Sequence, residues 1–315
     1  MQLHKSSDRG RGVEPFRGQV EVLEGRVLLS CTVKERLGTL TISGTAGADI
    51  VRISDGGSNA AGDVRVKCNN GAANALVVVA TNVGPINKIN INTGAGDDFA
   101  DYVVAAGATL VAPRSVTIKL GSGNNTGKVG ADLATVDANL IATVSSGNGK
   151  DLISVGAAGG IDPVLGFLPA TITAGHTLSV TASAGAGDDK VSLAADQATI
   201  NGSLVFDAKG AGGVDTLGAT AVDAVLGAGG LLSLTLQGGV GADVMDVAAG
   251  ILAAGAGSQA KISLLGSDHN DKLGLDFVGS APTLSLLING GLGTDTCELP
   301  VGIGPPQLTV IGCEL

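Results

Sequence analysis

Alternating apolar and polar positions recur along this chain, and the alternating runs meet at glycine-rich acidic turns. Leu178 and Val180 alternate with small polar residues, a Gly-Ala-Gly-Asp-Asp turn follows at 185–189, and a second alternating run covers 190–194. Alternation over about four to eight residues is typical of a half-buried β-strand. Glycine adopts the positive φ of a sharp corner without steric cost, and the aspartate side chain can accept a hydrogen bond from the backbone of its own turn. The stretch 178–193 therefore predicts two strands joined by a tight corner.

The same turn recurs at a nearly constant spacing. Copies lie around Asp97, Asn124, Asp151, Asp188, Asp215, Asp243, Asp271 and Asp295, with a looser copy at Asp49. Most consecutive copies are 27 or 28 residues apart, whereas the step from 151 to 188 is 37 and contains a Gly/Pro-rich stretch at 156–169. A fixed period of this size indicates a repeat architecture. We expect 156–169 to be a loop inserted into one coil.

Each repeat has room for three short strands. After Asp188 the alternating runs cover 190–194, 198–201 and 203–208. Three strands per coil of about 27–28 residues predict a three-sided coil, and stacked coils pair in parallel about 4.8 Å apart. Parallel β crossovers are almost always right-handed. The pattern therefore predicts an all-β fold, a right-handed parallel β-helix (β-solenoid) over 37–315, with a C-terminal cap at 296–315.

Composition narrows the kind of core. The chain of 315 residues has 51 glycines, no tryptophan and one tyrosine, and 44% of its residues are hydrophobic. The core must therefore be built from small and branched side chains. There is no run of 18 uninterrupted apolar residues, so we expect no transmembrane segment.

Charge divides the chain into two parts. Residues 1–36 contain seven Lys/Arg against five Asp/Glu, and residues 37–315 contain twelve against twenty-four. All acids after residue 36 are aspartates except Glu298 and Glu314. Acidity that comes almost wholly from aspartate indicates turns, or cation ligands on turns. An acidic array repels phosphate backbones, so we expect no nucleic-acid partner.

Stacked corners would align their acidic groups in a column. The candidate metal ligands are Asp97, Asp98, Asp151, Asp188, Asp189, Asp215, Asp243, Asp271 and Asp295. Ca²⁺ takes about 6–8 oxygens, including carboxylates and backbone carbonyls. The segments 238–245 and 290–297 resemble the calcium-binding nonapeptide GGxGxDxUx of the RTX (hemolysin-type) family, and this resemblance implies Ca²⁺ as a cofactor. RTX copies run in tandem, whereas single copies stand one coil apart here. Solvated corner turns that need no metal are the alternative interpretation.

The first 36 residues form a separate segment. They are basic and polar and lack the apolar stretch of an ordinary secretory signal. The residues Leu23, Glu24, Arg26, Leu28 and Leu29 resemble the LEPR-x-L-L segment near the N-terminus of many large planctomycete surface and exported proteins, although Gly25 replaces the proline of that pattern. The resemblance implies targeting to the cell envelope or the exterior. We expect 1–36 to be a disordered export segment.

Four cysteines fit neither a zinc spacing nor CxxC chemistry. Cys297 and Cys313 lie 16 residues apart, and a disulfide between them would stabilise the last coil by ~3 kcal/mol. Cys31 and Cys68 would do the same at the other end. Disulfides indicate an oxidising compartment, in agreement with export. Four buried thiols are the alternative.

We expect a non-enzymatic exported or cell-surface protein with a structural or adhesive role. Parallel β-helices also host polysaccharide lyases and hydrolases. In this chain, however, His4, His176 and His269 are scattered, and the paired carboxylates sit in turns. Envelope components or surface glycans are the expected partners. A carbohydrate-binding or polysaccharide-degrading β-helix is the alternative, with catalysis best placed in 156–169.

An ice- or surface-binding solenoid is a further alternative. Such a protein needs a flat ladder of threonines on one face. Thr41, Thr117, Thr143, Thr181 and Thr235 fall near comparable positions in their coils, but at irregular intervals. The sequence alone therefore gives this alternative little support.

Overall fold

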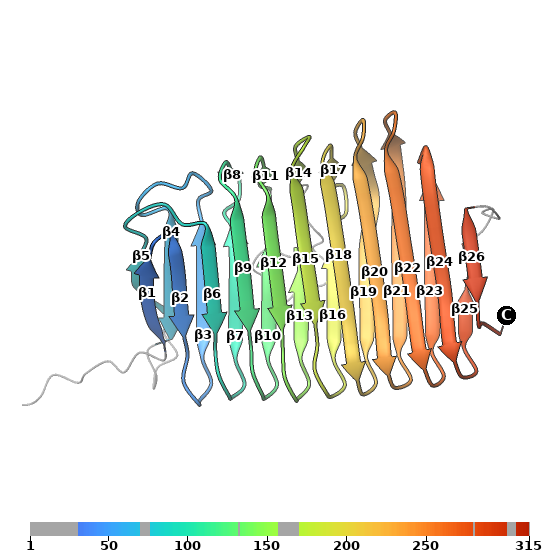
Figure 1. The fold of residues 1–315 in the computed structure, drawn as a ribbon, viewed down its shortest axis with the longest axis horizontal. Coiled ribbons are helices and arrows are strands. Elements are labelled where there is room, and N and C mark those ends of the chain that lie inside the picture. Colours follow the sequence, from blue (N-terminus) through green and yellow to red (C-terminus); the bar gives the residue numbers. More distant parts are fainter. Residues whose placement is uncertain are drawn as a thin grey trace, which may run out of the picture.

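The chain folds into a rod of stacked β-coils (Figure 1). The computed structural model describes residues 31–69, 76–131, 133–156, 170–279, 281–300 and 307–314. All regular secondary structure within these residues is β-strand. The predicted all-β solenoid of parallel coils is therefore confirmed. Its right-handedness stays a prediction.

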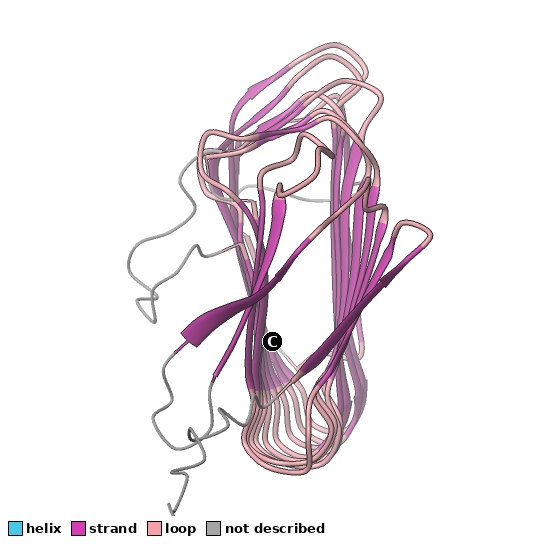
Figure 2. Cartoon of the chain, turned by 90° about the vertical axis from the view of Figure 1, so that its left-hand side faces the viewer, coloured by secondary structure: helices cyan, strands magenta, loops and turns pink. Residues whose placement is uncertain are grey.

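Two long sheets run along the rod, and Figure 2 shows them facing each other when viewed from the end. The first sheet contains, in spatial order, β1 (Thr32–Arg36), β2 (Thr39–Ser43), β6 (Lys88–Asn92), β9 (Arg114–Lys119), β12 (Leu140–Ser145), β15 (Thr177–Ser183), β18 (Ser203–Gly212), β20 (Leu231–Val240), β22 (Gln259–Asp268), β24 (Thr283–Leu292) and β26 (Leu308–Ile311). We call it sheet A.

The second sheet, sheet B, lies opposite. Its long path contains β5 (Leu76–Thr81), β4 (Val64–Asn69), β3 (Ile50–Asp55), β7 (Phe99–Val104), β10 (Thr126–Gly130), β13 (Leu152–Val155), β16 (Lys190–Ala194), β19 (Thr216–Leu226), β21 (Val244–Ala254), β23 (Lys272–Gly279) and β25 (Thr296–Glu298). Four two-residue strands form the narrow third side: β8 (Thr109–Leu110), β11 (Thr135–Val136), β14 (Thr171–Ile172) and β17 (Thr199–Ile200).

The number of strands per coil changes along the rod. In the coil that contains β16 and β17 the third side is a separate strand, as the sequence predicts. The next strand, β19, pairs with both of them and so runs continuously around that corner. A register shift between Ala221 and Val225 lets the strand bend there. Three strands per coil therefore describe the middle of the rod, and two long strands describe the later coils.

The core follows directly from the alternation in the sequence. In β15 intermediate and buried residues alternate strictly, and the inward side chains are Leu178, Val180 and Ala182. The next coil places Leu204, Phe206 and Ala208 on the same inward positions. Full burial of one Val, Leu or Phe side chain stabilises the fold by about 1.5–3 kcal/mol.

The N-terminal end departs from the repeat. Strand β1 pairs antiparallel with β2, and β3, β4 and β5 form an antiparallel meander at the start of sheet B. Strand β1 lies inside the segment 1–36 that the sequence analysis assigns to disorder, so that boundary is placed too late. Strand pairing already begins at Thr32, because residues 32–36 each pair with one residue of β2.

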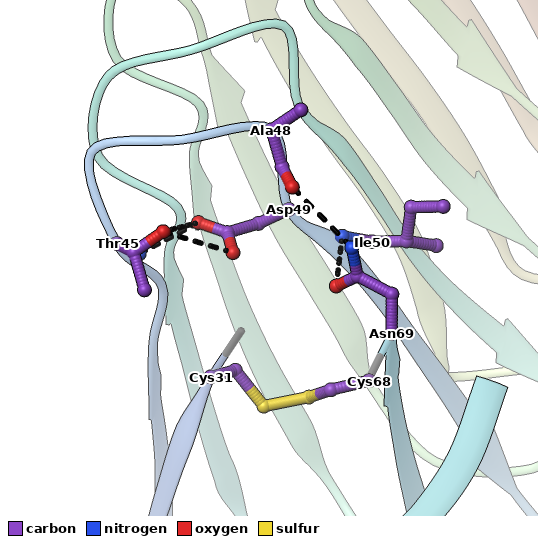
Figure 3. The surroundings of a disulfide bond; sticks show 7 residues. All are labelled: Cys31, Thr45, Ala48, Asp49, Ile50, Cys68 and Asn69. Atoms are coloured by element: carbon purple, nitrogen blue, oxygen red, sulfur yellow. Dashed lines mark hydrogen bonds between the residues drawn. A yellow bond between two sulfur atoms is a disulfide. The ribbon is translucent and has the colours of Figure 1, made fainter. Parts of the chain in front are cut away.

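Both expected disulfides form. Cys31–Cys68 ties the chain before β1 to strand β4 (Figure 3), and Cys297–Cys313 ties strand β25 to the chain after β26. Residues 1–30, which include all the expected targeting residues, lie outside the described residues. Residues 157–169 of the expected loop also lie outside them. Within the described part of the chain, no helix is long and apolar enough to span a bilayer.

Candidate functional site

The acidic corners form a hydrogen-bonded ladder along the rod. The backbone N–H of one corner residue donates to side-chain Oδ1 of the corresponding residue in the next coil, at N···O distances of 2.7–3.0 Å. The members, in order, are Asp49, Asp98, Asn125, Asp151, Asp189, Asp215, Asp243, Asp271 and Asp295. We call this set the inner ladder. It runs through the evenly stacked turns at the lower edge of Figure 2.

Both ends of the inner ladder are closed. No preceding coil donates to Asp49 within the described residues, and its carboxylate accepts the N–H and the hydroxyl of Thr45 instead (Figure 3). At the far end the N–H of Asp295 donates to Oε2 of Glu314, and the N–H of Glu314 returns to the carbonyl of Asp295. A glutamate therefore completes a column that is otherwise built from aspartate and one asparagine.

A second, exposed column runs beside the inner ladder. The N–H of Asn124 donates to Oδ1 of Asp97 at 2.8 Å, and the N–H of Lys150 donates to Oδ1 of Asn124 at 2.9 Å. The Nζ of Lys150 then contacts Oδ2 of Asp188 at 3.0 Å and lowers the pKa of that exposed carboxyl. The N–H of Val214 donates to Oδ1 of Asp188. We call this set the outer column.

The structure therefore divides the predicted candidates differently from the sequence analysis. Asp97 and Asp188 belong to the outer column, and Asn124 stands beside them. Asp98, Asp151, Asp189, Asp215, Asp243, Asp271 and Asp295 belong to the inner ladder, with Asn125 rather than Asn124 in the third position. The expected single column is wrong because the doublets place two adjacent side chains on opposite sides of the backbone.

The second carboxylate oxygen of the inner ladder is buried. Oδ2 has no hydrogen-bond donor in Asp98, Asp151, Asp189, Asp215, Asp243, Asp271 and Asp295. In the later coils this atom packs against the glycine five residues earlier: a Cβ on Gly238 would lie 2.4 Å from Oδ2 of Asp243, and a Cβ on Gly266 would lie 2.3 Å from Oδ2 of Asp271. The first glycine of these later turns is therefore required by the close approach of the carboxyl group.

Burial makes the charged form of these groups costly. It raises the pKa of Asp98, Asp189 and Asp243, and it raises the pKa of Asp215 and Asp271 to about 6. Neighbouring carboxylates add to most of these shifts. Two charged groups one strand spacing apart repel by about 3 kcal/mol at an effective dielectric constant near 20. A fully ionised inner ladder would therefore be strained.

The two carboxyl oxygens of the inner-ladder aspartates are placed differently. From Asp98 onward Oδ1 of each member accepts a backbone N–H, and Oδ2 of most of the aspartates is buried beside the turn backbone. No group of three or more His, Cys, Asp or Glu side chains in the described ranges is arranged to hold a metal. Calcium needs about 6–8 converging oxygens. Calcium at these turns stays a prediction of the sequence.

A buried polar cluster lies where the N-terminal meander meets the first regular coils. Nε of Arg114 contacts Oδ2 of Asp55 at 2.6 Å, the Tyr102 hydroxyl donates to the same oxygen at 2.8 Å, and both charged side chains are fully buried. Burial and Asp55 raise the pKa of Tyr102. The sequence analysis missed this cluster. Its signal is an arginine at an inward position that pairs with Leu140 in the next coil.

A small charged group lies on the outer face of sheet B. Arg52, Asp101 and Lys128 are aligned on β3, β7 and β10. Arg52 contacts Asp101 at 3.8 Å, and both cations lie over the Phe99 ring. Burial raises the pKa of Asp101 to about 6. The members satisfy one another, as cross-strand pairs on a sheet commonly do.

The threonines that fall near comparable positions in the sequence are aligned on sheet A, despite their irregular sequence intervals. Strand register places Thr41, Thr117, Thr143, Thr181 and Thr235 in one outward column. Asn90 stands between the first two and Asp207 between the last two, and Ser263, Leu287 and Thr309 continue the line. The sequence intervals are irregular because the meander and the 157–169 segment lengthen two coils.

An open groove of about 360 Å³ lies on sheet B near the bend of β19, β21 and β23, far from the inner ladder in each coil. Exposed Val222, Leu252 and Val278 line it together with Asp223 and Asp276.

Comparisons with protein-family models, with curated protein sequences and with solved structures find no match to this chain.

Proposed function

We propose that this chain is a non-enzymatic, exported structural rod of the cell envelope or exterior. The observation that carries the proposal is the use of the acidic corners. The carboxyl groups of the inner ladder, which would be the obvious candidates for chemistry, accept backbone N–H groups from one coil to the next. Their arrangement supports a role in holding the stack together.

The disulfides support the exported location. They join Cys31 to Cys68 and Cys297 to Cys313, one pair at each end of the rod. Disulfides persist in oxidising compartments and are rare in the cytosol. A rod whose two terminal coils are covalently tied resists fraying at the positions where a solenoid opens first.

Fractionation of cells that express the tagged full chain tests this proposal. We expect the protein in the envelope or medium, with all four cysteines oxidised when thiols are alkylated and the mass is measured. The purified chain should release no product from a panel of polysaccharides. Cytoplasmic protein with four free thiols, or product release that persists at high purity, would overturn the proposal.

A second candidate function is binding to a regular surface, and the threonine column on sheet A favours it. Threonines at six of the column's positions present a methyl and a hydroxyl group at multiples of the ~4.8 Å strand spacing. Such an array matches a repeating partner better than a small molecule. Ice and crystalline glycans are both partners of this kind.

The variant Thr143→Lys places a long charged side chain in the middle of the column. Ser192→Lys, on the outer face of sheet B, is its matched control. We expect Thr143→Lys alone to reduce retention on crystalline cellulose or chitin, or to reduce inhibition of ice recrystallisation. Equal behaviour of the two variants in all three assays would remove this candidate.

A further inference from the structure

One coil shows what the inner ladder requires at its buried second atom. Asn125 takes the place of an aspartate there, and its Oδ1 accepts the N–H of Asp98 at 3.0 Å. Its Nδ2 therefore faces the other way and donates to the carbonyl oxygens of Gly123 at 2.9 Å and Gly121 at 3.3 Å. These carbonyls belong to the residues two and four positions earlier in the same turn.

The aspartate coils repeat this turn without the donor. The Oδ1 hydrogen bond is the same for Asp215, Asp243 and Asp271. The residues four and two positions earlier have positive φ in these coils as in the Asn125 coil, although their identities differ: Gly121 and Gly123, Ala211 and Gly213, Gly239 and Gly241, and Ser267 and His269. This shared turn backbone places Oδ2 where Asn125 has Nδ2. An ionised Oδ2 there would place an acceptor against acceptors, buried and without a partner. An unsatisfied buried charge is costly. A proton on Oδ2 removes the charge and restores a donor toward the turn carbonyls.

We propose that the inner ladder binds protons at its buried oxygens: in the folded chain Asp215, Asp243 and Asp271 hold a proton on Oδ2 that the unfolded chain releases. Each is then a neutral carboxylic acid that accepts an N–H through Oδ1 and donates through Oδ2. The Asn125 amide is the natural analogue of this neutral form.

The surrounding charges support the protonated form. Asp215 faces the carboxyls of Asp189, Asp243 and Asp188, and Asp271 faces those of Asp243 and Asp295. Asp98 faces Asp49 and Asp97, and Asp189 faces Asp151 and Asp188. The opposing group is His269, which favours ionisation of Asp243 and Asp271 when it is charged. Burial still dominates, and the pKa values of Asp215 and Asp271 rise from 3.8 to about 6.

The raised pKa values fix the direction of the pH dependence. Between about pH 4 and pH 6 the folded chain binds more protons at these sites than the unfolded chain, so the free energy of unfolding falls as the pH rises. The contribution of these groups is complete below the unfolded pKa and is lost as the pH passes through the folded pKa. A calcium column would behave in the opposite way, because protons compete with the metal.

The experiment uses thermal unfolding of the full chain with oxidised disulfides, from pH 4 to pH 7.5, in chelator and then in millimolar Ca²⁺. The variants are Asp215→Asn with Asp271→Asn, the reciprocal Asn125→Asp, and, as the control, Asp223→Asn in the groove of sheet B, far from the inner ladder. We expect the Tm of the parent to fall as the pH rises. The double asparagine variant should have a higher Tm at pH 7, by about 2–4 °C per site, and a smaller slope with pH.

Asn125→Asp should behave as the parent near pH 4 and lose Tm at pH 7, whereas Asp223→Asn should keep the parental slope. Infrared spectra give a readout that does not depend on stability: the carbonyl band of protonated carboxylic acid should persist at pH 6 in the folded parent and weaken in the double variant. A lower Tm of the double variant at pH 7 would overturn the proposal. So would a Ca²⁺-dependent rise in parental Tm that the double variant loses, or a missing infrared band.

Discussion

The N-terminal meander and the later coils are stabilised by different kinds of contact. Residues 31–81 begin the rod with antiparallel pairs, a disulfide and a buried Arg114–Asp55 ion pair. From β18 onward each coil consists of two long strands joined by a glycine-rich turn, and these strands pair in parallel with those of the neighbouring coils. One aspartate per coil connects it to the next coil. The start of the rod uses individual side-chain contacts, whereas its body uses one contact many times.

The difference teaches where stability is local and where it is shared. A coil in the body contacts two neighbours of almost the same design, so a defect in one coil is buffered by the stack. The meander has a neighbour on one side, and its buried charges have no substitute. Substitutions near Asp55 should therefore lower the free energy of unfolding more than equivalent substitutions in the body of the rod.

The largest expected effect comes from breaking the buried ion pair. Asp55→Ala leaves Arg114 charged, buried and facing an empty position, which should lower the free energy of unfolding by about 3–5 kcal/mol in chemical denaturation. Replacing both residues with apolar side chains, Asp55→Leu with Arg114→Met, should recover most of that loss. A single-variant cost below 1 kcal/mol would contradict the comparison.

The two disulfides should contribute unequally. Replacing Cys31 and Cys68 with serine opens a loop of 37 residues and should cost ~4 kcal/mol, whereas replacing Cys297 and Cys313 opens a loop of 16 residues and should cost ~3 kcal/mol. Denaturant titration of the two double variants measures both values. A larger loss at the C-terminal end would reverse the ranking of the two ends.

A single turn in the body can be tested with two adjacent glycines. Gly213 has a φ of +131°, and a Cβ there would lie 2.0 Å from the carbonyl oxygen of Gly187. Gly213→Ala should therefore destabilise the rod by more than ~1 kcal/mol. A Cβ on Gly212 meets nothing within 4 Å, so Gly212→Ala should leave the Tm nearly unchanged. Similar losses in both variants would show that the turn itself is not the constraint.

The smallest expected effect lies in the outer column. Lys150→Met removes the partner of Asp188 on an exposed surface, where ion pairs contribute little. The Tm should stay within error of the parent, and the pKa of Asp188 should rise toward its ordinary value because Lys150 no longer lowers it. An NMR titration of the Asp188 carboxyl measures this shift. A marked loss of Tm would mean that the outer column supports the stack.

Much of the fold could be predicted from the sequence because the repeat is written into it. The spacing of the Gly-Asp turns gives the coil, the alternation gives the inward side chains, and the positions of Cys297 and Cys313 at one end give a disulfide. Each of these signals is local or periodic. The antiparallel pairing of β1 with β2 also has a local signal, which the search for the repeat overlooked: only Leu37 and Gly38 separate the strands, and both have positive φ, as in a two-residue hairpin turn.

The site was harder to predict because one residue of register decides it. Asp97 and Asp98 are adjacent and chemically identical, yet the first is exposed in the outer column and the second is buried in the inner ladder. Only the alternation of side chains across the backbone separates them. The threonines were named from the sequence but given little support for a related reason, because spatial register is preserved across coils of unequal length while sequence intervals are not.

The inner ladder has a direction. From Asp98 onward, every corner residue donates its N–H toward the C-terminal coil and accepts through its side chain from the N-terminal one. Deleting or duplicating one whole coil therefore joins two ends that are already complementary, and the final glutamate still closes the column. The rod can change its length in evolution by whole-coil steps without any new contact having to arise, which makes length the property of this molecule most open to selection.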